Sequence, residues 1–165
     1  MQTQVCTSQE APTSIGGESM SLLFDFNNKL DWRNEKMNIW YEQLLKPDWA
    51  PPPWLFGPVW TVLYIVIIIT FGKTILMLAK SKINFMIFLP FLLNIVFNIA
   101  FTPLQFGLQN NLLAFLDIIL ILLTLVWAMV AIYKYVPWVT FANIPYLLWV
   151  SFATVLQAQI TLLNF

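Results

Sequence analysis

Aromatic side chains in the apolar part of the sequence are spaced so that they can hold a flat ligand. Phe56, Trp60 and Tyr64 recur every four residues, and Tyr146 and Trp149 are three apart, so each set shares one face of a helix. Aromatic rings at the ends of membrane-spanning helices usually form an interfacial belt. Rings deeper in the membrane cannot take part in such a belt, but they can form the walls of a flat apolar pocket.

Carboxamide side chains are a second group with chemical potential. Asn94 and Asn98 are four apart, on one face of a helix, and Gln157 and Gln159 are expected to lie deep in the last apolar stretch. Amides buried in hydrocarbon need hydrogen-bond partners. Two interpretations stay open: the amides link neighbouring helices, or Asn98 lines a cavity and orients a ligand there.

Asp117 is the only acidic residue after Trp54. An acid inside the membrane is a functional candidate. Asp117 lies about two helical turns after the GLQNN connection (107–111), however, so it can also reach the interface or bond to a neighbouring helix. A single acid cannot supply the carboxylate pair of a glycosidase. The chain has no histidine, which removes the commonest metal ligand and general base, so we expect no metal site and no resident cofactor.

The elements that must position these residues are membrane helices. The chain is 59% hydrophobic and 10% charged, which is too apolar for a soluble domain of this length. Its net charge is zero without a basic cluster, so nucleic-acid binding is not expected. We predict an all-α integral membrane bundle in a bacterial inner membrane or an organelle membrane.

The predicted organisation has three parts: a disordered tail (1–21), a charged interfacial segment (22–48) and a transmembrane bundle (49–165). The bundle contains four apolar stretches, each near the roughly 20 residues that cross a bilayer. Short connections between them predict antiparallel neighbours. The stretches are residues 54–79, 83–106, 112–133 and 138–163.

Three motifs resemble one known family. KPDWAPPPWLFGPVWTVLY (46–64), with WYEQL (40–44) before it, resembles the opening signature of the tryptophan-rich sensory protein family. This family includes the mitochondrial translocator protein, also called the peripheral benzodiazepine receptor. NIAFTPLQFG (98–107) and PYLLWVSFATVL (145–156) resemble two later signatures in the right order.

The resemblance implies a membrane bundle whose cavity binds porphyrins such as protoporphyrin IX or haem, with a transport, receptor or sensory role. It also implies a homodimer. Trp60 and Trp149 are expected to face each other across the pocket. The ligand-binding residues that the motifs carry over are Trp49, Phe56, Trp60, Tyr64, Asn98, Phe101, Asp117, Tyr146 and Trp149.

Alternatives and departures come with the resemblance. Some bacterial members promote light- and oxygen-dependent porphyrin breakdown through tryptophans equivalent to Trp60 and Trp149, so an enzyme of this kind is one alternative. Sterol binding is another, but the C-terminal QAQITLLNF lacks the tyrosine and the basic residue of the proposed cholesterol motif. A regulatory scaffold for a membrane partner is a third. The family has five spans, and its first helix is degenerate or missing here, where residues 22–38 are charged.

Overall fold

The computed structural model describes residues 39–165, of which 43–165 form one compact unit. It confirms the all-α membrane bundle, because this part contains no strand and has four helical segments long and apolar enough to cross a membrane. The expected tail and most of the interfacial segment, residues 1–38, lie outside the described residues. The four segments are Pro53–Ala79, Phe85–Gly107, Asn111–Tyr133 and Pro137–Leu163.

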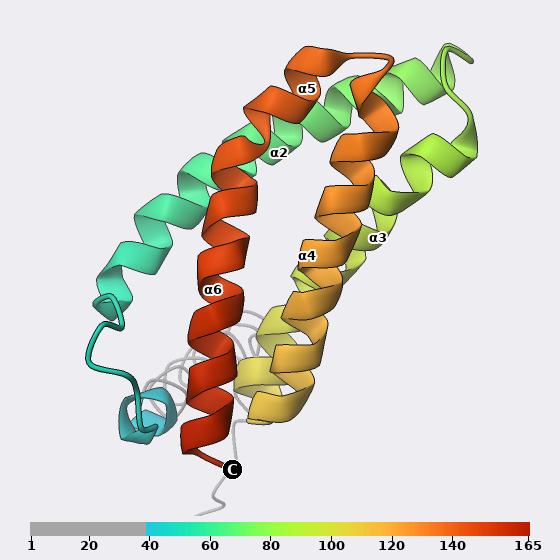
Figure 1. Cartoon of the computed structure of the whole chain (residues 1–165). Coiled ribbons are helices and arrows are strands. Elements are labelled where there is room, and N and C mark those ends of the chain that lie inside the picture. The colour runs from blue at the N-terminus through green and yellow to red at the C-terminus, as the bar shows by residue number, and fades with distance from the viewer. Residues whose placement is uncertain (1–38) are drawn as a thin grey trace, which may run out of the picture. The chain divides into compact units, whose positions relative to one another are not determined.

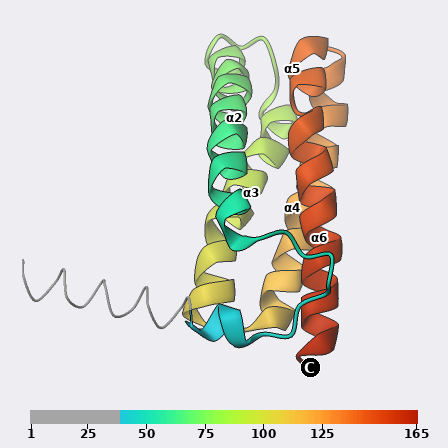
Figure 2. The same cartoon turned by 90° about the vertical axis from the view of Figure 1, so that its left-hand side faces the viewer.

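Each predicted apolar stretch matches one of these segments to within two residues at either end. Successive segments run antiparallel, joined by short turns (Figures 1 and 2). The elements in chain order are η1 (Pro53–Leu55), α2 (Phe56–Ala79), α3 (Phe85–Thr102), the π-helical turn η2 (Pro103–Gly107), α4 (Asn111–Tyr133), α5 (Pro137–Ala142) and α6 (Ile144–Leu163).

Two asparagines begin the helices that follow the first two turns. The Asn84 side chain accepts a hydrogen bond from the backbone N–H of Met86 at 3.4 Å, and the Asn110 side chain accepts one from Leu113 at 3.0 Å. Side-chain acceptors of this kind satisfy N–H groups that have no partner in the first turn of a helix. The chain therefore restarts each helix immediately after reversing direction.

The sequence pattern predicts one continuous helix for the fourth segment. In the structure, this segment breaks at Asn143, between α5 and α6. Pro145 has no N–H to donate to the preceding turn, which weakens a continuous helix there. The break is stabilised by Asn143, whose Nδ2 donates to the Val139 carbonyl at 2.8 Å. Its Oδ1 accepts from the Thr70 hydroxyl of α2 at 3.4 Å. The break thus joins the fourth segment to the first.

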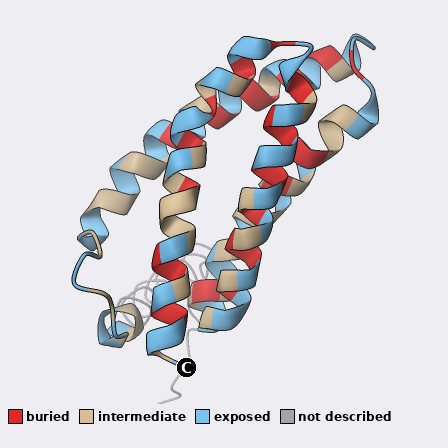
Figure 3. Cartoon of the chain, viewed as in Figure 1, coloured by how far each residue is buried: buried red, intermediate tan, exposed pale blue. Residues whose placement is uncertain are grey.

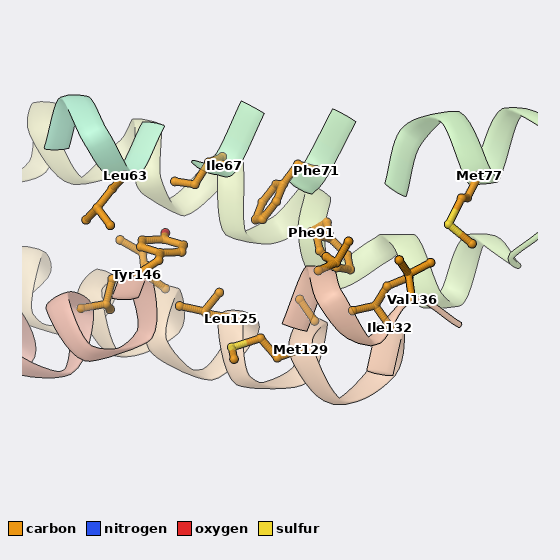
Figure 4. Close-up of a cluster of buried hydrophobic side chains, with 14 of the residues drawn as sticks. Leu63, Ile67, Phe71, Met77, Phe91, Leu125, Met129, Ile132, Val136 and Tyr146 are labelled. Atoms are coloured by element: carbon orange, nitrogen blue, oxygen red, sulfur yellow. The ribbon is translucent and has the colours of Figure 1, made fainter. Parts of the chain in front are cut away.

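The helices share one apolar core, which Figure 4 shows in close-up. α4 packs against α3 on one side and α6 on the other, while α2 packs against α3 and α5. Buried residues lie along the facing sides of the helices, and exposed residues cover much of the remaining surface (Figure 3). Core side chains come from all four segments, including Leu63, Phe71, Phe91, Leu125, Ile132 and Tyr146.

The outward surface is also apolar, with Ile68 and Val130 as typical exposed side chains. This suits a bilayer, where lipid chains rather than water surround the helices. Trp54 and Trp138 are exposed near the starts of the first and fourth segments, at opposite ends of the bundle. Indole rings in such positions are typical of the membrane interface.

Candidate functional site

Aromatic rings bridge α2 and α6 near the end of the bundle where α2 begins. The first turns of α2 contain no buried residue before Leu63, and there α2 diverges from α6 (Figure 1). Phe56 meets Trp149 edge-on, with ring centroids 5.6 Å apart. One turn further along α2, Trp60 meets Tyr146 with centroids 6.4 Å apart. Because the two helices are antiparallel, these pairs lie one helical turn apart.

Further rings extend this aromatic group at both sides. Tyr64 packs against Trp60 with centroids 5.4 Å apart, although its side chain is 48% exposed. Phe152 contacts Trp149 at 5.6 Å and Trp49, in the loop before α2, at 5.7 Å. Phe152 is not among the residues predicted from the sequence, although it follows Trp149 by three residues and therefore shares its helix face.

Trp60 and Trp149, which the family resemblance places opposite each other across the pocket, each contact a different ring in the structure. Each indole is half-buried, packs against the core and pairs with a ring of the opposite helix, Trp60 with Tyr146 and Trp149 with Phe56. Both indoles therefore turn toward the inside of the bundle. Phe101 also packs against the core, but from α3. The roles of all these residues in ligand binding stay predictions.

A chain of polar side chains crosses the bundle at the inner edge of this group. Asn98 of α3 donates a hydrogen bond to the hydroxyl of Tyr146, which in turn donates to Oδ1 of Asn94 at 3.0 Å. Asn94 is 1% exposed, and its Nδ2 donates to the Ile121 carbonyl at 2.9 Å and to the Thr124 hydroxyl at 3.1 Å. The interpretation of Asn94 as a link between helices is therefore confirmed, because it joins α3, α4 and α6.

Two buried polar atoms have no hydrogen-bond partner in the described part of the chain: Oδ2 of Asp117 and Nε1 of Trp149. Buried polar groups are nearly always paired, so each exception needs a physical reason such as a ligand or water. Asp117 is 5% exposed and lies four residues before Ile121, on the side of α4 that faces α3. Within residues 39–165, no group of three His, Cys, Asp or Glu side chains could hold a metal ion.

The two glutamines of α6, Gln157 and Gln159, differ in burial. Gln157 donates to Oε1 of Gln105 at 2.9 Å, and Gln105 donates to Oδ1 of Asn111 at 3.2 Å. Thr161 donates to the Asn111 carbonyl at 3.1 Å, which closes this second cluster. Gln159, in contrast, is exposed, so the expectation that both glutamines lie deep is wrong for Gln159. Its position two residues from Gln157 places it on the opposite side of α6.

Comparison with known proteins identifies the family. The family model of the TspO/MBR family matches residues 20–163, a range that includes the charged stretch 22–38. The chain is 35% identical to the tryptophan-rich protein TspO of Chlorobaculum tepidum over 93 residues, which are 56% of this chain and 58% of that protein. It is also 35% identical to the protein of the same name from Archaeoglobus fulgidus over 105 residues, 61% and 65% of the two chains.

The translocator protein of Ovis aries is 31% identical over 84 residues, which are 49% of this chain and 48% of that protein. These matches span less than two thirds of each relative's length. The motifs recognised in the sequence and the family match agree with the observed membrane helices. The chain is an integral, multi-pass membrane protein, and it belongs to the TspO/MBR family.

Proposed function

We propose that the protein binds flat, hydrophobic, porphyrin-like ligands between α2 and α6, as part of a transport or sensory role. The observation that carries this proposal is the inward-facing aromatic group, in which Trp149 pairs with Phe56 and Trp60 pairs with Tyr146 across the two helices. Rings on opposite helices offer two flat apolar faces, which a planar macrocycle can stack against.

The packing around these rings supports the proposal. α2 is held mainly by α3 and α5, and α6 is held by α4, so side chains rather than close backbone packing join α2 to α6. The first turns of α2 bury no residue. A ligand inserted between the rings would therefore displace side-chain contacts and leave the helix pairs of the core intact.

The unpaired polar atoms also support a binding site. The indole N–H of Trp149 is enclosed without an acceptor, which costs free energy unless something compensates. A ligand that brings an acceptor to this N–H would recover that cost. Binding would otherwise come from buried apolar area, at about 25 cal/mol per Å² before ordering costs.

A titration of the purified full-length protein in lipid nanodiscs tests the proposal. Protoporphyrin IX added in the dark should quench tryptophan fluorescence and shift its own Soret band. Trp60→Phe and Trp149→Phe should each weaken binding by roughly 3- to 10-fold, since aromatic pairs contribute about 0.5–1.5 kcal/mol beyond area. Trp127→Phe is the matched control, because Trp127 is an exposed indole of α4.

Two results would argue against binding at this site: no saturable change in either signal, or equal weakening by Trp127→Phe. The same titration under illumination separates binding from chemistry. Lasting loss of the Soret band that needs Trp60 or Trp149 would indicate light-dependent porphyrin degradation, whereas a reversible spectrum would indicate binding alone. The homodimer implied by the family stays a prediction.

A further inference from the structure

The direction of every hydrogen bond around Tyr146 follows from a single backbone carbonyl. The Ile121 carbonyl can only accept, so the amide group of Asn94 that lies 2.9 Å away must be its Nδ2. Nδ2 also donates to the Thr124 hydroxyl, whose own proton goes to the Leu120 carbonyl at 2.7 Å. Oδ1 of Asn94 therefore faces Tyr146, and the Tyr146 hydroxyl must donate to it.

The direction of the Tyr146 hydrogen bond also determines the orientation of the Asn98 amide. Because the Tyr146 hydroxyl donates its only proton to Asn94, it can only accept a hydrogen bond from Asn98. Nδ2 of Asn98 must therefore face this hydroxyl. The carbonyl oxygen, Oδ1 of Asn98, is then the far end of the amide. It accepts no hydrogen bond from residues 39–165, and it is not one of the two enclosed atoms without a partner. Within residues 39–165, Oδ1 therefore keeps its capacity to accept a hydrogen bond.

The site lies where this oxygen can meet the edge of a ligand. Trp60 packs against the ring of Tyr146, and Asn98 is bonded to the hydroxyl at the rim of that same ring. A planar ligand stacked on these rings has its rim beside Asn98. An acceptor at this place is complementary to a donor on the ligand.

Charge narrows the class of ligand further. The helices α3, α4 and α6 contain no lysine or arginine. An ionised carboxylate seated beside Asn98 would have no cation on these helices to pair with, and burying an unpaired charge is costly. A propionate is therefore disfavoured beside these helices, and we expect a porphyrin's propionate edge to face away from Asn98.

We infer that Asn98 presents its carbonyl oxygen to the ligand, and that the ligand edge seated there carries an uncharged N–H or O–H donor. This inference rests on the proposed function and assigns the chemistry of the ligand edge. Asn94 acts as a positioning residue, since its bond to the Ile121 carbonyl determines which way the Asn98 amide points.

Two porphyrin amides, one with N–H donors at its edge and one without, test the inference. Both propionates of protoporphyrin IX are converted to primary amides in one probe and to N,N-dimethylamides in the other, and each is titrated against the full-length protein in nanodiscs. The primary amide should bind about 3- to 10-fold more tightly, the ratio expected for one hydrogen bond. Asn98→Leu should abolish this preference, whereas Trp127→Phe, which changes an exposed indole of α4, should retain it.

Tyr146→Phe is a second variant that does not remove Asn98. It frees the Asn98 amide to rotate, so the preference should fall toward a ratio of one while the dimethylamide still binds. Equal or tighter binding of the dimethylamide to the unmodified protein would overturn the inference and leave the proposed function standing, as would a preference that survives in both variants. If neither amide binds the unmodified protein while protoporphyrin IX does, the inference fails and the proposed function stands. If protoporphyrin IX also fails to bind, both fail.

Discussion

The side chain of Asn164 forms two hydrogen bonds with the backbone of Leu45, 119 positions earlier in the chain. The Leu45 N–H donates to Oδ1 of Asn164, and Nδ2 of Asn164 donates to the Leu45 carbonyl, both at 2.9 Å. This pair fastens the loop before α2 to the end of α6. The same loop carries Trp49, which packs edge-on against Phe152 of α6 beside Trp149.

Asn164→Ala is expected to loosen this loop and speed ligand release. Two hydrogen bonds are lost, each with a net value of about 0.5–1.5 kcal/mol, so we expect the dissociation rate of protoporphyrin IX to rise roughly 5-fold or more. Stopped-flow tryptophan fluorescence measures this rate. Gln159→Ala, which removes an exposed amide from the same helix, is the control, and an equal rate in both variants would contradict the prediction.

Asn94→Leu is expected to destabilise the bundle because it leaves the Tyr146 hydroxyl without an acceptor for its proton. A buried group left unpaired costs about 1–3 kcal/mol, and the additional hydrogen bond from Asn94 to the Ile121 carbonyl is lost as well. Thermal unfolding in detergent measures the loss. Combining the substitution with Tyr146→Phe should cost less than the sum of the two single changes, and strict additivity would mean that the hydrogen bond contributes nothing.

Gln157 and Gln159 are expected to respond oppositely to the same substitution. Gln157→Leu removes the N–H group that donates to Oε1 of Gln105 and to the Asn111 carbonyl in a buried cluster. It should therefore lower the free energy of unfolding by about 1–3 kcal/mol. Gln159→Leu changes an exposed side chain and should leave stability nearly unchanged or raise it in a lipid environment. Comparable losses in the two variants would show that burial does not separate these amides.

Sequence periodicity predicted the helices well, because a bilayer demands long apolar stretches and each turn is marked by charged or amide residues. The break at Asn143 escaped prediction because Pro145 is compatible with both a kinked and an interrupted membrane helix. The contact of Asn143 with Thr70 of α2 joins residues 73 positions apart, so no local pattern reveals it.

The candidate site was predicted in part. Four-residue spacing correctly placed Phe56, Trp60 and Tyr64 on one side of α2, but pairing across helices is a tertiary property. Thus the contacts of Trp149 with Phe56 and Phe152 come from the structure alone. The polarity of the Asn98 amide likewise depends on a backbone carbonyl in another helix, which no local pattern reveals.

Asp117→Asn is expected to stabilise the ligand-free protein and to weaken ligand binding if the carboxyl contacts the ligand as the family resemblance implies. Oδ2 of Asp117 is enclosed without a partner, and a neutral amide costs less to bury than a carboxylate. We expect a gain of about 1 kcal/mol, of the size common when a functional group is neutralised at a site built for binding rather than for stability. Thermal unfolding without ligand and porphyrin titration measure the two effects, with Asp48→Asn in the exposed loop as the control. A less stable Asp117→Asn protein would show instead that the carboxyl supports the fold, because only a favourable contact made by the acid could outweigh its cost of burial.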